Sequence, residues 1–261
     1  MTGSNGDVVT DGEQQQHFEE SPIVLVHGAF HGGWCWEALK ADLEGRGRRV
    51  QVVPQLPSGG ATPDGLGGLH DDAAAVREVL ERIGEPVMLV GHSYGGAVIS
   101  ELAGSPLVSE AVYVAGMWPE RGQCVFDLVN AMTGEAPRWF APVGDTALAT
   151  DPVMARAVFY ADVEPGLAEA AANRLGLQSI ASATEESTTQ GWGATPTTYV
   201  VCTADLVIPP ADQDRYATRA DRVVHIESGH SPFLARPHEL AELLSPDHAP
   251  SSDNDGAGAA R

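Results

Sequence analysis

The feature that most constrains this chain is an apolar run that leads straight into a glycine-rich turn around a serine. Residues 87–90 are Val-Met-Leu-Val, residues 91–95 are Gly-His-Ser-Tyr-Gly, and a segment of small and apolar residues follows at 97–103. A strand, a sharp turn and a helix in this order expose a serine at the end of a buried strand, and Gly91 and Gly95 leave room for the crowded backbone. The stretch therefore predicts that Ser93 is a nucleophile.

Strands and helices alternate along most of the chain, which predicts a parallel sheet. Continuous apolar runs, typical of strands buried on both faces, alternate with segments of helical periodicity. The predicted strands are 22–27, 49–53, 87–90, 110–114, 197–202 and 222–226, and the predicted helices are 35–43, 71–83, 97–103, 210–218 and 237–244. The alternation implies right-handed crossovers and an α/β fold with helices flanking the sheet. The glycine-rich stretch 59–68 has no phosphate-loop pattern and is interpreted as a connection.

The alternation breaks between residues 118 and 194. No convincing buried strand is found there, whereas helices fit 124–132, 151–160, 164–175 and 177–186, and Asp151 and Pro152 suit an N-cap and a first helical position. We therefore expect a helical cap, 118–194, inserted between two parts of one α/β-hydrolase-like core, 21–117 and 195–244. The polar ends are expected to be a flexible leader, 1–20, and a disordered tail, 245–261.

Charge and cysteine content restrict the classes of partner and the compartment. The chain has 36 acidic and 15 basic residues and a formal charge of -21, which opposes binding to nucleic acid and to anionic membranes. No apolar run approaches the roughly 20 residues that span a bilayer. The three cysteines are widely spaced and lack the spacing of zinc ligands, so we expect reduced thiols, no metal site and a cytoplasmic location.

Two polar residues after the last predicted strands complete a hydrolytic set with the serine. Ester hydrolysis at neutral pH needs a nucleophile, a base that takes its proton and a group that orients the base. His230 follows the last strand and is the candidate base, and Asp205 follows the preceding strand and is the candidate orienting acid. Glu120 and Asp212 are rival acids. The order of serine, aspartate and histidine along the chain is that of α/β hydrolases.

Backbone amides are expected to form the oxyanion hole. One is the N–H of Tyr94, directly after the nucleophile, and the other lies in the loop after the first strand, where Ala29 is favoured and Phe30 is the alternative. Loss of one such donor in hydrolases costs ~3 kcal/mol of transition-state stabilisation. The peptide groups at these positions therefore matter more than the side chains.

Aromatic residues and one histidine are candidates for the wall of a substrate pocket. Those in the predicted cap can also pack against each other, and the histidine can be a packing residue, so both interpretations stand for each of them. The candidates are Phe30, His31, Trp118, Phe126, Trp139 and Phe159.

Four stretches of the chain together resemble esterases of the α/β-hydrolase superfamily. The likeness is to bacterial members similar to the branch that includes plant methylesterases and hydroxynitrile lyases, and it covers nearly everything between residues 22 and 244. It extends to FYAD at 159–162 and RL at 174–175. The four stretches are HGAFHGGWCW at 27–36, GHSYGG at 91–96, VCTAD at 201–205 and GHSPF at 229–233.

One departure from that branch bears on the reaction. Hydroxynitrile lyases of the branch carry a lysine directly after the catalytic histidine and a threonine in the oxyanion loop, whereas this chain has Ser231 and Ala29 there, and its only lysine is Lys40. The resemblance therefore implies ester hydrolysis rather than cyanohydrin cleavage.

The expected activity is cleavage of a small or medium carboxylic ester, without a cofactor, by a monomer or homodimer. A lactonase, thioesterase or amidase would use the same residues. A cofactor-free cyclase or lyase, or a non-catalytic receptor for a small ligand, would keep the fold and use the site differently. The sequence leaves these alternatives open.

Overall fold

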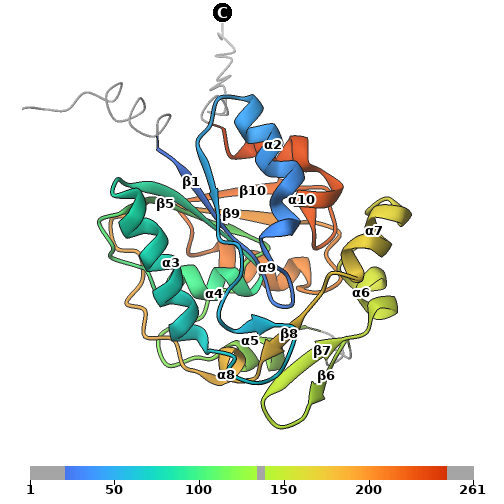
Figure 1. Ribbon diagram of the computed structural model, residues 1–261. Coiled ribbons are helices and arrows are strands. Elements are labelled where there is room, and N and C mark those ends of the chain that lie inside the picture. Colours follow the sequence, from blue (N-terminus) through green and yellow to red (C-terminus); the bar gives the residue numbers. More distant parts are fainter. Residues whose placement is uncertain (1–20, 134–138, 246–261) are drawn as a thin grey trace, which may run out of the picture.

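The computed structural model describes residues 21–133 and 139–245 (Figure 1). The predicted leader, 1–20, and residues 246–261 of the predicted tail lie outside the described residues. Among the residues described, no helix is both long enough and apolar enough to cross a membrane.

A six-stranded parallel sheet forms the centre of the protein. Its strands are β1 (Ile23–Val26), β2 (Val50–Val52), β4 (Val87–His92), β5 (Val108–Val114), β9 (Thr197–Cys202) and β10 (Arg222–Ile226). Their order is β10-β9-β5-β4-β1-β2, and every pairing between neighbours is parallel. Each of the six predicted strands is present, because continuous apolar runs suit strands that are buried on both faces. This arrangement confirms the predicted fold class.

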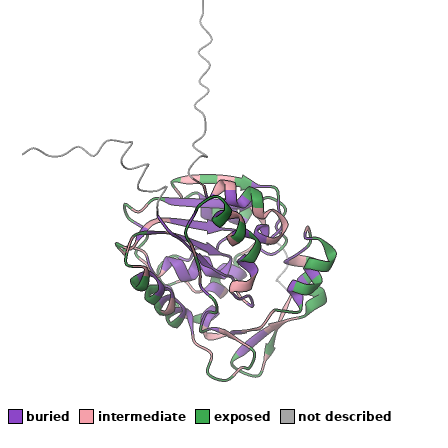
Figure 2. Ribbon diagram, turned by 45° about the horizontal axis from the view of Figure 1, so that its top comes forward, coloured by how far each residue is buried: buried purple, intermediate pink, exposed green. Residues whose placement is uncertain are grey.

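Helices cover both faces of the sheet and divide the core into two clusters. Apolar side chains of α3 (Leu69–Ile83), α4 (Tyr94–Ser100) and α9 (Pro210–Ala217) pack on one face. Those of the 3-10 helix η1 (Gly33–Trp36), α2 (Glu37–Gly45), α10 (Pro232–Ala235) and α11 (Pro237–Leu243) pack on the other. Figure 1 shows α2 and α10 on one side of the strands and α3 and α4 on the other. Buried residues follow the central strands, and exposed residues lie on the outer helix faces (Figure 2).

The inserted segment, residues 118–194, is not all helical, which corrects the prediction. It contains α5 (Val125–Asn130), α6 (Pro152–Val158), α7 (Pro165–Ala172) and α8 (Ala181–Thr184), and also the strands β6 (Phe140–Val143), β7 (Ala147–Thr150) and β8 (Leu177–Ser179). These strands join β3 (Gly59–Gly60) in a four-stranded antiparallel sheet of order β3-β8-β7-β6. The stretch predicted as a helix over 177–186 therefore begins as a strand, and the glycine-rich connection supplies that strand's partner.

The predicted start of the helix at residue 152 is confirmed. The Oδ1 atom of Asp151 accepts hydrogen bonds from the N–H groups of Val153, at 2.8 Å, and Met154, at 3.1 Å, while Pro152 occupies the first turn. An N-cap aspartate satisfies backbone donors that the helix itself cannot. This local signal fixes where α6 begins.

Candidate active site

Ser93 lies in a tight turn between β4 and α4. The positions two residues before and after it, 91 and 95, have room only for glycine. The φ of 51° and ψ of -120° of Ser93 are sparsely populated for a residue with a side chain, and such a conformation costs about 1–3 kcal/mol. A Cβ atom on Gly91 would lie 2.5 Å from the carbonyl oxygen of Gly95, and one on Gly95 would lie 2.6 Å from that of Val26. The turn is held because the carbonyl oxygen of Ser93 accepts the N–H of Met117 at 2.9 Å.

His230 and Asp205 form a buried pair at the carboxyl ends of β10 and β9. The Nδ1 atom of His230 lies 2.8 Å from Oδ2 of Asp205, and both side chains are almost fully buried. The other carboxylate oxygen, Oδ1, accepts the N–H groups of Val207, at 2.7 Å, and Ile208, at 3.0 Å. Because the carboxylate can only accept, Nδ1 donates to it, which leaves Nε2 as the ring nitrogen that can act as a base.

The two rival acids are engaged elsewhere. Glu120 is exposed, and its carboxylate lies 3.8 Å from the guanidinium of Arg219. Asp212 is buried, and its Oδ2 accepts both the N–H and the hydroxyl of Thr133. The geometry therefore pairs His230 with Asp205.

Gln213 holds Asp205 in place, a role that the sequence did not indicate. Its Nε2 atom donates to Oδ2 of Asp205 and to the carbonyl oxygen of Ile208, both at 2.8 Å, while its Oε1 accepts the N–H of Cys202 at 2.9 Å. The side chain is fully buried in α9. The one available signal was a polar residue on the inner face of a predicted helix, which does not identify its partner.

The loop after β1 lies against the proposed nucleophile. A Cβ atom on Gly28 would lie 3.0 Å from Cβ of Ser93, so the loop backbone passes directly beside the serine. The N–H of Phe30 already donates to Oε1 of Gln178 at 3.2 Å, and Phe30 has a φ of 65°. Of the two amides weighed from the sequence, that of Phe30 is therefore engaged within the protein.

His31 joins this loop to the inserted segment. Its Nδ1–H donates to the carbonyl oxygen of Ala29 at 2.8 Å, so its Nε2 accepts the hydroxyl of Tyr160 at 2.8 Å. Burial lowers the pKa of His31 to about 3, and the ring is neutral. His31 is thus a packing residue that also lines a cavity.

Two further buried histidines support the catalytic turns. The Nδ1–H of His27 donates to the carbonyl oxygen of Gly28 at 2.9 Å, and burial lowers the pKa of His27 to about 4. The Nε2–H of His92 donates to the carbonyl oxygen of His230 at 2.8 Å, and burial lowers the pKa of His92 well below its usual range. Both rings are neutral, and each fixes a backbone carbonyl beside the site.

A cavity of about 660 Å³ lies between the oxyanion loop and the inserted segment. It is lined by Phe30 and His31 together with residues 149–150 and 174–177. Phe159 and Trp139 pack against the ring of Phe30 at centroid distances of 6.5 and 6.1 Å. Phe159 also lies 5.8 Å from the ring of His230. Four of the six pocket candidates thus form one cluster beside the loop after β1, and Phe159 joins that cluster to the ring of His230.

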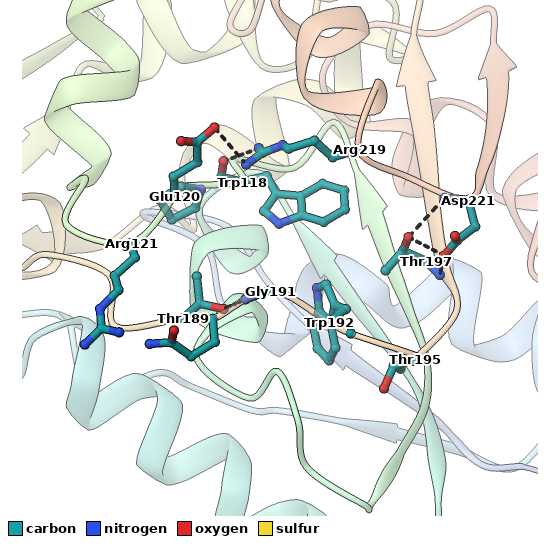
Figure 3. Close-up of a pocket in the computed structure, with 13 residues that line it drawn as sticks. Trp118, Glu120, Arg121, Thr189, Gly191, Trp192, Thr195, Thr197, Arg219 and Asp221 are labelled. Atoms are coloured by element: carbon teal, nitrogen blue, oxygen red, sulfur yellow. Dashed lines mark hydrogen bonds and ion pairs between the residues drawn. The ribbon is translucent and has the colours of Figure 1, made fainter.

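The other two candidates lie apart. Phe126 stacks on Phe140 at 6.3 Å within the inserted segment. Trp118 lines a separate cavity of about 410 Å³, beside Trp192 and Arg219 (Figure 3). Neither this cavity nor the one of about 660 Å³ is lined by Ser93, Asp205 or His230. The indole of Trp118 stacks on Tyr113 at 4.1 Å and lies beneath the guanidinium of Arg219. Trp118 thus packs against Tyr113 and Arg219 and lines a cavity apart from the cluster around Phe30.

Ligands for a metal are not assembled in the described part of the chain, where no three histidine, cysteine or carboxylate side chains converge. The three cysteines are free thiols, and Cys35 and Cys202 are buried. The polar groups of the site are instead those of the triad and the neighbouring amides.

Comparisons with known proteins agree with this fold. Norfluorocurarine synthase 2 from a Strychnos species is 30% identical over 267 residues, covering 90% of this chain and 96% of the relative. Methylesterase 9 from Arabidopsis thaliana is 28% identical over 250 residues, covering 85% of this chain and 95% of the relative. The crystal structure of a pyrethroid hydrolase from Sphingobium faniae JZ-2 matches with a TM-score of 0.71 at 25% identity, covering 88% of this chain and 98% of that one. The sequence profile of the Alpha/beta hydrolase family matches residues 23–243, and the chain therefore belongs to the alpha/beta hydrolase family.

Proposed function

We propose that the protein is a serine esterase that cleaves a small or medium carboxylic ester through an acyl-enzyme. The observation that carries the proposal is the buried pair of His230 and Asp205, 2.8 Å apart, at the same sheet edge as the strained turn of Ser93. A histidine oriented by a carboxylate beside a nucleophilic serine is the arrangement that activates a hydroxyl at neutral pH.

The reaction follows from these groups. Ser93 Oγ attacks the ester carbonyl while Nε2 of His230 takes its proton, and the oxyanion that forms accepts hydrogen bonds from the N–H groups of Ala29 and Tyr94. His230 then gives the proton to the departing alcohol. Water repeats the sequence on the acyl-enzyme, releasing the acid and restoring Ser93. Asp205 stabilises the imidazolium of His230 each time it forms.

The inserted segment acts in this proposal as a cap that shapes the substrate cavity. The cavity of about 660 Å³ has the size of a site for a small organic molecule, and its walls join the oxyanion loop to residues 149–150 and 174–177 of the segment. Phe159 adds an apolar surface near His230. Two relatives are named for hydrolytic activity, a methylesterase and a pyrethroid hydrolase, which supports an ester as substrate.

A non-hydrolytic reaction at the same site is the second candidate. Norfluorocurarine synthase 2, which is named for a synthesis, matches over 90% of this chain. In such a reaction the oxyanion amides would polarise a carbonyl without formation of an acyl-enzyme.

The test is a series of p-nitrophenyl esters of increasing acyl length, assayed with the wild type and with Ser93→Ala. The esterase proposal expects turnover by the wild type and loss of turnover in the variant by a factor on the order of 10⁶, as for triad serines. A fluorophosphonate should label Ser93 in the wild type. Labelling at another residue would contradict the assignment of the nucleophile, and binding of esters without turnover would favour the second candidate.

A further inference from the structure

Besides the bond between Tyr160 and His31, the inserted segment forms two hydrogen bonds with the backbone of Phe30 in the oxyanion loop. The N–H of Phe30 donates to Oε1 of Gln178 at 3.2 Å, and the carbonyl oxygen of Phe30 accepts the N–H of Gly176 at 2.8 Å. Phe30 has a φ of 65°, in the left-handed region that favours glycine. Because Phe30 directly follows Ala29, the two contacts fix the end of the loop that presents the Ala29 amide.

The side-chain amide of Gln178 is also connected by hydrogen bonds to Tyr94, the other proposed oxyanion residue. Its Nε2 atom donates to the hydroxyls of Ser58, at 2.8 Å, and Ser182, at 2.7 Å. The hydroxyls of Ser58, at 2.5 Å, and Tyr94, at 2.6 Å, both donate to Oδ2 of Asp72. All five side chains are buried. Gln178 is thus joined through a continuous hydrogen-bonded chain to the residue whose N–H is the second proposed donor.

A second side chain of the inserted segment holds the loop that carries His230. The Oδ2 atom of Asp162 accepts the N–H of Gly229 at 2.8 Å and the hydroxyl of Ser228 at 3.1 Å. A Cβ atom on Gly229 would lie 2.5 Å from Oδ1 of Asp162, so only glycine permits this approach. That Oδ1 atom is buried and has no hydrogen-bond partner among the described residues.

We propose that Gln178 and Asp162 are positioning residues through which the inserted segment sets the catalytic geometry. Gln178 fixes the oxyanion loop, and Asp162 fixes the loop of His230. The inference rests on the proposed function and deepens it, because it makes the segment a support of the reacting groups as well as a wall of the substrate cavity. Removal of either contact therefore lowers turnover more than substrate affinity.

The experiment compares Gln178→Met and Asp162→Leu, which keep side-chain size and remove the hydrogen bonds, with Asp162→Asn, which keeps an oxygen to accept the N–H of Gly229. Thr198→Val is the matched control, because it removes a buried hydroxyl that bonds Glu110 at the amino-terminal end of β9, the end of that strand opposite to Asp205. Two rates are measured: phosphonylation of Ser93 by a fluorophosphonate, and steady-state hydrolysis of a p-nitrophenyl ester, with kcat and KM separated. Thermal unfolding of each variant is recorded alongside.

In Gln178→Met and Asp162→Leu, we expect kcat and the labelling rate to fall by about 10- to 100-fold, because the reacting groups are displaced. KM should change little. Asp162→Asn should regain most of the rate, and Thr198→Val should label like the wild type. Folded variants that label at the wild-type rate, or that raise KM alone, would overturn the positioning roles while the proposed function stands. A wild type that neither labels nor hydrolyses would overturn the proposed function itself. The two contacts are separate, so a variant that fails to fold leaves the other to decide.

Discussion

At the scale of single residues, the carboxylate of Asp205 is the most constrained group in the site. Its oxygens lie within hydrogen-bond distance of four donors: two backbone N–H groups, the amide of Gln213 and the ring of His230. A carboxylate with this many fixed donors has one orientation, and it passes that orientation to the imidazole. Two predictions follow from the arrangement of these side chains.

Asp205→Asn should lower kcat by up to ~10⁴-fold, because an amide that donates toward Nδ1 favours the wrong tautomer of His230. The measurement is steady-state hydrolysis of an ester that the wild type turns over. Glu120→Gln is the control and should keep the wild-type rate. The reverse result, with activity lost only in the Glu120 variant, would transfer the role of the acid to Glu120.

Gln213→Met should lower kcat by about tenfold or more while KM changes little, since Asp205 loses one donor and gains freedom to rotate. Stability should also fall by roughly 1–3 kcal/mol, because the N–H of Cys202 and the carbonyl oxygen of Ile208 lose their partner in the core. Kinetics and urea unfolding check the two effects separately. Unchanged kcat in a destabilised variant would leave Gln213 a purely structural residue.

At the scale of elements, the serine turn depends on close packing of α4 against β1. A Cβ atom on Gly95 would lie 2.6 Å from the carbonyl oxygen of Val26 and 2.7 Å from that of His27. Both neighbours are backbone atoms of the central sheet and cannot move without disturbing it. The glycine is therefore required by the contact between the two elements.

Gly95→Ala should destabilise the protein by at least about 1–3 kcal/mol, the cost of overpacking, and should abolish labelling of Ser93. Gly45→Ala is the matched control, because a Cβ atom at the end of α2 meets nothing within 4 Å. The control should be stabilised by about 0.5–1 kcal/mol, since alanine has less freedom than glycine in the unfolded chain. Urea unfolding measures both, and equal stabilities would contradict the contact.

The elements that sequence predicted well are those with local causes. The parallel strands follow from apolar runs buried on both faces, and the start of α6 follows from Asp151 and Pro152. The strands of the inserted segment were not predicted, because β8 pairs with two glycines at 59–60 that carry no strand pattern of their own. Residues such as Gln213, Asp162 and Gln178 act through partners far along the chain, so no local pattern marks them.

At the scale of the whole molecule, buried titratable groups set how stability depends on pH. Burial lowers the pKa of His27 to about 4 and of His31 to about 3, lowers that of His92 well below its usual range, and raises the pKa of Asp72 to about 6. Below pH 6.5 the unfolded chain takes up protons on the three histidines while the folded protein does not. Asp72 opposes this, because its folded carboxyl is protonated at a higher pH than its unfolded one.

Burial also raises the pKa of Glu110, which opposes the histidines in the same sense as Asp72. The three histidines outweigh Asp72, so acidification should destabilise the fold. Between pH 6 and pH 5 the unfolded chain binds about two more protons than the folded one, and the free energy of unfolding should fall by about 2–3 kcal/mol per pH unit from these groups. The midpoint of urea unfolding at pH 7, 6 and 5 measures the loss of stability. His31→Gln should make the midpoint depend less on pH. A midpoint independent of pH would contradict the neutral, buried state of these rings.

The hydrogen bonds from Tyr160, Asp162 and Gln178 to the loops that carry Ala29 and His230 restrict which parts of the inserted segment can change in sequence without loss of activity. Trp139 contacts the ring of Phe30, and the hairpin of β6 and β7 pairs with β8, the strand that carries Gln178. Among the described residues, 139–158 form no hydrogen bond with the backbone of the loops that carry Ala29 and His230, so exchange of these residues with those of a relative should alter which acyl groups fit. A graft of the entire inserted segment must bring compatible residues at positions 160, 162 and 178. Changes at residues 139–158 can therefore alter the substrate range, whereas changes at positions 160, 162 and 178 also affect the geometry of the reacting groups.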